Sequence, residues 1–234
     1  MENILFNIQD PSGKGYIECY FNPKKQYLSI EAKNIILTQE IIGKFFNIVS
    51  EKVRVMKLRT LALELNNCSA KQEDLNKLLK YLSKFKTKGI ILILTQTNIN
   101  DNHAETLAEL ISNNSNLERF SLRLGKTEIT EKGAHILARA LSKMKSLKEV
   151  GFIIKKNNDE QSKKVLSIIM NKIHAENIET LGFIGLNCGL RTKDLKFFSK
   201  LFSRFRNVRR FSICLLYTSP SPRDLSTSRM PSSA

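Results

Sequence analysis

The sequence predicts an α/β solenoid, in which strand–loop–helix units of roughly 30 residues stack side by side. Apolar residues recur in columns spaced 29 to 31 residues apart. Within each unit they first alternate with polar residues, as in a strand with one buried face, and then follow helical spacing. Because one unit cannot bury its own apolar face, the units are expected to share a core between a parallel sheet and a helical layer. Helices are wider than strands, so the stack should curve into a horseshoe, with the sheet on its concave face and the helices on its convex face.

The composition is that of an ordinary folded chain. The 234 residues are 41% hydrophobic and 26% charged, and no apolar run approaches the roughly 20 residues of a membrane span. The N-terminus lacks the basic and apolar regions of a signal peptide, which predicts a cytoplasmic protein, with the nucleus as the alternative. The cysteines form no C-x-x-C pair, which argues against a zinc or redox motif and suits a reducing compartment. They are Cys19, Cys68, Cys188 and Cys214.

The chain is strongly basic, with a net charge of +16. An excess of this size often marks a nucleic-acid or acidic-surface partner. The alternative is that lysines coat the outer helices for solubility, and their dispersion along the chain favours this second interpretation.

Residues 1–25 are predicted to form an N-terminal β-hairpin cap. Two strand-like segments, Ile4–Ile8 and Tyr16–Phe21, flank the turn-forming cluster Pro11–Gly15. A solenoid needs its first apolar layer covered, and this hairpin would cover it. The solenoid itself is assigned to residues 26–215, as six to seven units with the last one incomplete.

The units are placed by their apolar columns. An irregular first unit has Leu28 and Ile30 in its strand and a helix over 38–52. The next strands carry one buried column at Leu61, Ile90, Phe120, Val150, Leu181 and Phe211, and another two residues further on at Leu63, Leu92, Leu122, Phe152, Phe183 and Ile213. Helices are expected over 70–85, 101–114, 131–144, 159–174 and 192–205, three of them after caps at Asn100, Thr130 and Asn157–Asp159.

A family pattern is visible in the strand–loop segments. Leu58–Cys68 reads LRTLALELNNC and follows the pattern L-x-x-L-x-L-x-x-N/C-x-L, and Thr130–Leu141 has the matching entry into a helix. On these residues the chain resembles the ribonuclease-inhibitor subfamily of leucine-rich repeats, over about residues 26–215. The resemblance implies the horseshoe fold and a role as an interaction scaffold.

In that subfamily the Asn or Cys of the pattern bonds to backbone groups of the loops. The resemblance therefore implies that Cys68 and Cys188 are structural rather than reactive thiols. Thr97, Gly125 and Asn157 stand where a regular Asn or Cys is expected, so the loop ladder is imperfect.

The C-terminal residues 216–234 differ in composition from the rest. This Ser-, Pro- and Arg-rich tail holds three of the five prolines and resembles translated cloning-adaptor sequence. The alternative is a native disordered linker. In either case the last strand has no following helix, so Phe211 and Ile213 are expected to line an open edge, as in a protein that naturally continues.

The sequence offers no set of catalytic residues. The three histidines fall in or beside different helices, and the motifs H-E-x-x-H, G-x-S-x-G and G-x-G-x-x-G are all missing. We therefore expect a protein that is not an enzyme and has no metal or cofactor.

The candidate binding residues are those that alternate with the core columns and so face outward from the concave sheet. Four are isoleucines, which is unusual for an outward face and typical of a protein interface. The alternative is that a neighbouring segment or a missing domain covers them. The predicted partner-binding residues are Glu31, Glu64, Ile91, Ile93, Arg123, Ile153 and Ile184.

A second candidate is the basic region 191–210, whose predicted helix has an apolar face and a basic face. This pattern is typical of helices that bind RNA, an anionic surface or a target protein, although Phe198 occupies the core column of the repeat. A third alternative is a regulatory domain of a larger protein, as the resemblance allows. The basic residues are Arg191, Lys193, Lys196, Lys200, Arg204, Arg206, Arg209 and Arg210.

Overall fold

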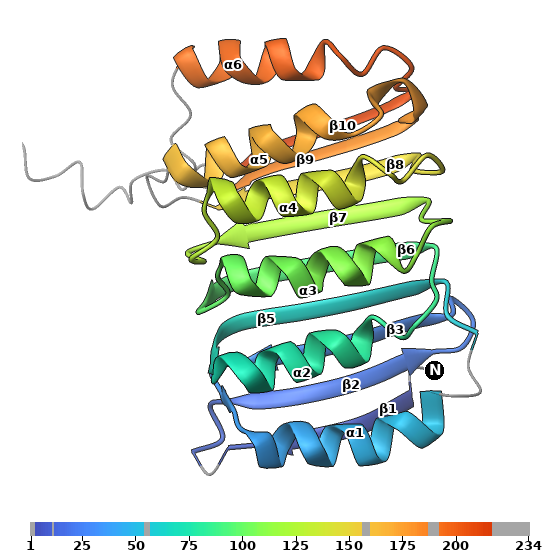
Figure 1. The fold of residues 1–234 in the computed structure, drawn as a ribbon, viewed down its shortest axis with the longest axis vertical. Helices are drawn as coiled ribbons and strands as arrows, with labels where there is room; N and C mark the ends of the chain where they lie inside the picture. Colours follow the sequence, from blue (N-terminus) through green and yellow to red (C-terminus); the bar gives the residue numbers. More distant parts are fainter. Residues whose placement is uncertain (1–2, 11, 54–56, 156–159, 187–191, 217–234) are drawn as a thin grey trace, which may run out of the picture.

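The computed structural model describes residues 3–10, 12–53, 57–155, 160–186 and 192–216. In these residues the chain forms one open, mostly parallel sheet of ten strands that alternate with helices (Figure 1). The sheet order is β1-β2-β3-β5-β6-β7-β8-β9-β10, and β4 pairs with β5 beside this path. The predicted alternation of strands and helices is confirmed, and the arrangement is solenoid-like because sequence neighbours are spatial neighbours throughout.

The strands are β1 (Asn3–Gln9), β2 (Tyr16–Asn22), β3 (Tyr27–Lys33), β4 (Ile36–Leu37), β5 (Thr60–Ala70), β6 (Gly89–Thr97), β7 (Arg119–Gly125), β8 (Glu149–Lys155), β9 (Thr180–Leu186) and β10 (Arg210–Leu216). The helices are α1 (Gln39–Val53), α2 (Gln72–Leu82), α3 (Asp101–Ser112), α4 (Glu131–Leu141), α5 (Glu160–Lys172) and α6 (Thr192–Phe202), with a short 3-10 turn η1 (Ala175–Asn177). The β1–β2 and β2–β3 pairs are antiparallel, and the strands from β3 to β10 pair in parallel.

The apolar columns lie in register across the sheet. Leu61 of β5 pairs with Ile90 of β6, and the same column continues through each following strand. Its members are at most 3% exposed as far as Leu181, whereas Phe211 of the last strand is 51% exposed. The shared core therefore runs the length of the stack and thins at β10.

Helices α2 to α6 each end two or three residues earlier than the sequence pattern predicts. The chain leaves α3 at Ser112, and Asn114 then accepts a bond from the Thr87 N–H at 2.7 Å and donates one to Leu110 O at 2.8 Å. An asparagine side chain competes well for backbone groups, so α3 ends at Ser112 and Asn114 lies beyond the helix.

A left-handed residue recurs at a matching place in four units, just after β3 and β7 and near the ends of β5 and β6. Asn34, Asn67, Gln96 and Lys126 all have φ between 50° and 53°, and each follows the last outward residue of its strand. The first two are also linked, because Asn67 Nδ2 donates to Asn34 Oδ1 at 3.0 Å. Asparagine tolerates this conformation well, whereas glutamine and lysine adopt it at some cost.

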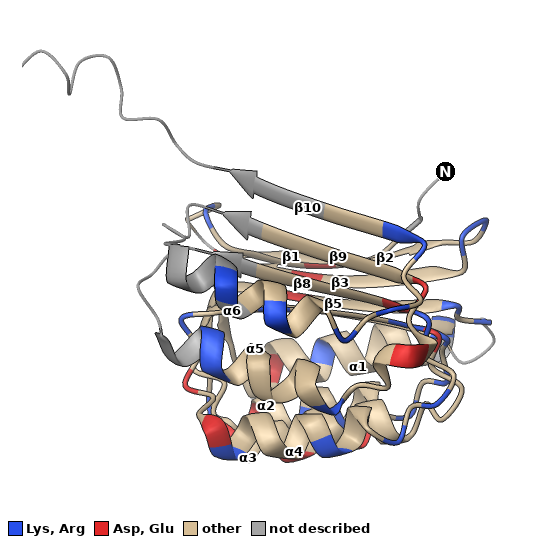
Figure 2. Ribbon diagram, turned by 90° about the horizontal axis from the view of Figure 1, so that it is seen from above, with Lys and Arg blue, Asp and Glu red and all other residues tan. Residues whose placement is uncertain are grey.

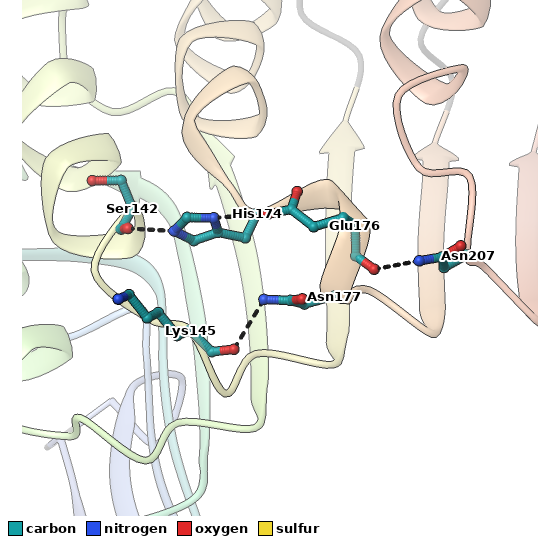
Figure 3. Close-up of polar contacts among 6 residues, drawn as sticks. All are labelled: Ser142, Lys145, His174, Glu176, Asn177 and Asn207. Carbon is teal, nitrogen blue, oxygen red and sulfur yellow. Dashed lines mark hydrogen bonds and ion pairs between the residues drawn. The ribbon is translucent and has the colours of Figure 1, made fainter.

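Polar side chains join successive units at the turns between helix and strand (Figure 3). Asn177 Nδ2 donates to Lys145 O at 3.1 Å, and Asn207 Nδ2 donates to Glu176 O at 2.7 Å. His174 Nε2 lies 2.8 Å from Ser142 O, which ties α4 to the unit of α5. These bonds satisfy backbone carbonyls that the helix ends leave without partners.

At the opposite end of the helices, Asp101 links two helix starts. Asn100 and Thr130 act as N-caps of α3 and α4, as the sequence predicts, while the predicted cap at Asn157–Asp159 lies outside the described residues. Asp101 Oδ1 accepts from the N–H groups of Thr130 at 2.8 Å and Gly133 at 3.0 Å, and its Oδ2 accepts from the Thr130 hydroxyl at 2.6 Å. Burial acts to raise the pKa of Asp101, but the bonds from Thr130 and Gly133 outweigh it, and the pKa lies below its ordinary value.

We predict that Asp101→Asn lowers the free energy of unfolding by about 1 kcal/mol, as expected for a lost helix cap. The native pKa of Asp101 is depressed, so its contribution is complete above the unfolded-state value of about 3.9 and is lost as the pH falls through the native value. Urea unfolding at several pH values should show the gap to wild type closing below about pH 4. Glu105→Gln on exposed α3 surface is the control, and an equal loss in both variants would contradict the link.

Candidate interaction surface on the open sheet face

The sheet has one covered face and one open face. All described helices lie on the same side of the sheet, and no described element covers the other side (Figure 2). We call this uncovered side the open face. Because strand side chains alternate, every second residue of each strand points toward it. The strand register then aligns these residues in rows that run across the strands.

Six of the seven predicted partner-binding residues share one row, which we call the central row. From β2 to β9 it reads Glu18, Glu31, Glu64, Ile93, Arg123, Ile153 and Ile184. All seven side chains are partly exposed rather than buried. The remaining predicted residue, Ile91, lies one row away on the same face. Glu18 was missed because the sequence pattern alone does not fix the register of the hairpin.

The first part of the central row is acidic. Glu18, Glu31 and Glu64 occupy matched positions on three neighbouring strands, where like charges disfavour one another. Tyr16 donates a hydrogen bond to Glu31, and Asn66 Nδ2 donates to Glu64 Oε1 at 2.7 Å. Among the described residues, none of the three carboxylates forms an ion pair with a lysine or arginine.

The second part of the central row is apolar around a single cation. Arg123 of β7 stands between Ile93 of β6 and Ile153 of β8. Its Nε is buried and has no hydrogen-bond partner within the described part of the chain. An arginine held between apolar side chains with a free donor is a typical interface residue, because its planar guanidinium binds carboxylates with two parallel bonds.

The neighbouring row, which we call the small row, contains a hollow. From β6 to β9 it reads Ile91, Ser121, Gly151 and Gly182. The missing side chains leave a hollow of about 250 Å³ between Ile91 and a third row formed by Arg119, Glu149 and Thr180. A Cβ added at Gly182 would meet no heavy atom closer than 3.9 Å, so there is room for a side chain to begin at this glycine.

The wall of the hollow on the third row is held in place. Arg119 Nη2 donates to Thr60 Oγ1 at 2.9 Å, and the guanidinium passes over Gly89, where an added Cβ would lie 3.2 Å from its Nε. Thr180 Oγ1, also beside the hollow, is buried without a partner among the described residues. Arg119 is therefore hydrogen-bonded within the sheet, whereas Arg123 Nε has no partner among the described residues.

The described residues of the predicted basic region lie on different elements. Lys196 and Lys200 are exposed on α6, in the helical layer, while Arg210 begins β10 in the sheet layer (Figure 2). Arg204 donates to Met170 O at 3.0 Å and Asn171 Oδ1 at 3.3 Å, so it serves packing between units. Arg206 and Arg209 are exposed near the turn before β10. Arg191 and the Lys193 side chain lie outside the described residues.

Cys19 and Cys68 are poorly placed to act as reactive thiols. Cys19 and Cys68 are buried and unpaired, and burial raises the pKa of Cys19 to about 12 and that of Cys68 above its ordinary value. Cys68 Sγ lies 3.3 Å from Asn66 O, within the loop of its own unit. Cys188 and the tail 217–234 lie outside the described residues.

In the described ranges no group of His, Cys, Asp and Glu could hold a metal ion, and no helix is long and apolar enough to span a membrane.

Comparison with known proteins adds no assignment. No protein-family model matches the chain, and no curated protein matches it either. Any function must therefore be argued from the open face itself.

We predict that Tyr16 titrates near pH 12 and that Glu31→Gln moves its pKa toward the ordinary value of 10. The hydrogen bond to the Glu31 carboxylate is the main cause of the raised pKa, with burial second. NMR with ring-labelled tyrosine, with Tyr16→Phe to assign the resonance, would follow the titration. An unchanged pKa in Glu31→Gln would mean that this bond does not order the acidic part of the row.

Proposed function

We propose that the chain is a leucine-rich-repeat solenoid that acts as a non-enzymatic scaffold and binds a partner protein on the open face. The observation that carries the proposal is the central row, in which isoleucines stand beside a hollow together with Arg123, whose Nε has no partner in the described part of the chain. Partly exposed isoleucines on β6, β8 and β9, with Arg123 of β7 between them, add apolar area to the open face, which favours association. A hollow next to it offers a place for one anchoring side chain.

The resemblance to the ribonuclease-inhibitor subfamily supports the repeat assignment. The structure adds supporting features that recur about every 30 residues, namely the left-handed residue at or near the end of a strand and the asparagine bonds between units. Asn98 bonds both backbone groups of Ala70 in the preceding unit, at 3.3 and 2.7 Å, beside the position where Thr97 replaces the expected Asn or Cys. The neighbouring residue thus supplies the loop contact that the pattern assigns to Thr97.

A protein partner fits the open face better than RNA does. Glu18, Glu31 and Glu64 would repel a phosphate backbone, and the basic residues of 191–210 are divided between two layers. The buried free thiols Cys19 and Cys68 also fit the proposed cytoplasmic location, because reduced cysteines persist there.

We predict that the double variant Ile93→Asp, Ile153→Asp stays folded but loses partner capture. Both side chains are only partly buried, so each change should cost little more than the roughly 1 kcal/mol span of strand propensities, whereas two new charges would oppose binding to an apolar surface. Quantitative affinity purification of the tagged full chain would measure the capture. Ile48→Asp on the exposed surface of α1 is the matched control.

Proteins retained by wild type and by Ile48→Asp but lost by the double variant would identify open-face partners. Equal retention by all three chains would overturn the proposal. Binding of RNA or anionic vesicles that weakens steeply with salt would instead favour the basic region, because neutralised phosphates release counterions.

A further inference from the structure

We propose that the open face selects a partner segment that carries a carboxylate for Arg123 and an apolar side chain for the hollow. This inference rests on the proposed function and specifies the chemistry of its partner. It is carried by two neighbouring features of the same strands, the hollow and the Arg123 guanidinium, whose buried Nε has no partner among the described residues.

The case for a carboxylate begins with the surroundings of Arg123. Its two neighbours in the central row are Ile93 and Ile153, so neither adjacent strand places a carboxylate beside it in that row. Its Nε is buried and unpartnered within the described residues. Isoleucines on both sides limit the water that can reach the guanidinium, and an arginine in such a place gains most from a two-bond contact with a carboxylate.

A carboxylate fits this place better than a nucleic-acid backbone. Polyanions are bound through several cations that follow the chain of phosphates. The central row offers one cation here, and Glu64 lies two strands away, at roughly 10 Å for a strand spacing of about 4.8 Å. A single Asp or Glu side chain at Arg123 stays clear of the Glu64 carboxylate, whereas a long anion would extend toward it and be repelled.

The case for an apolar side chain comes from the hollow. Ser121, Gly151 and Gly182 bring the sheet backbone to the surface, and Ile91 closes one end of the space. Ser121 lies two residues before Arg123 on β7, so the hollow and the guanidinium are roughly 7 Å apart. Alternate side chains of an extended segment, or side chains three or four apart on a helix, span that distance.

The test uses the full chain and a random linear peptide library displayed on phage. We expect enriched peptides to contain Asp or Glu within about four residues of a large apolar side chain. Arg123→Gln should weaken a selected peptide by about tenfold or more, the loss expected for a hydrogen-bonded charge. Arg123→Glu should recover binding to the same peptide with its acidic residue changed to lysine. Arg139→Glu, on exposed α4 surface, is the control for net charge.

A second variant tests the hollow without removing any contact. Gly182→Val has an ordinary backbone conformation and room for the new Cβ, so the chain should remain folded while the valine fills the space. We expect the selected peptides to lose most of their affinity. Gly43→Val on α1, where an added Cβ also meets nothing within 4 Å, is the matched control.

The outcomes separate this inference from the proposed function. Peptides that lose binding in the Ile93→Asp, Ile153→Asp chain but lack an acidic residue, or tolerate Arg123→Gln and Gly182→Val, would overturn the partner chemistry alone. A library that yields no binder, or binders indifferent to every open-face change, would count against both.

Discussion

The structure depends on one constraint, that no strand–helix unit can bury its own apolar face. The strand and helix of each unit pack on one side against the preceding unit and on the other side against the following unit. Parallel pairing in register is the arrangement that brings Leu61, Ile90 and their successors into one column, where they are almost completely buried. A slip of one residue would turn that column to the solvent, so the core fixes the register strongly.

The same constraint determines the open face. Once the core columns are fixed, the alternate residues must form rows on the other side of the sheet, and their identities are free to vary without cost to the core. This freedom allows the central row to carry three carboxylates and then Arg123, while the small row beside it carries Gly151 and Gly182 on adjacent strands. The polar bonds between units, such as those of Asp101 and Asn177, lie at the two ends of the helices and join successive units without using this face.

Much of this architecture could be predicted from periodicity, because the columns report burial directly. The expected strands and helices are present, and six of the seven outward residues fall in one row, since their spacing matches the repeat. Other features depend on information that spacing does not contain. To predict the Tyr16–Glu31 hydrogen bond, one would have to know the register between β2 and β3. To predict that Arg119 bonds Thr60, one would have to know which side chains lie within reach of each arginine. The early end of α3 follows from side-chain competition by Asn114, whose position relative to Thr87 the repeat spacing does not give. The described part of the basic stretch 191–210 is divided because it crosses from a helix into a strand.

The central claim is that a partner contacts the open face, and the isoleucine methyl groups allow a direct test. NMR of the chain with labelled isoleucine methyls, with and without a saturating selected peptide, would report the contact residue by residue. The account predicts that the largest shifts occur at Ile91, Ile93 and Ile153, while the exposed Ile36 and Ile48 stay unchanged. Shifts confined to Ile36 and Ile48, with the open-face methyls unmoved, would contradict it.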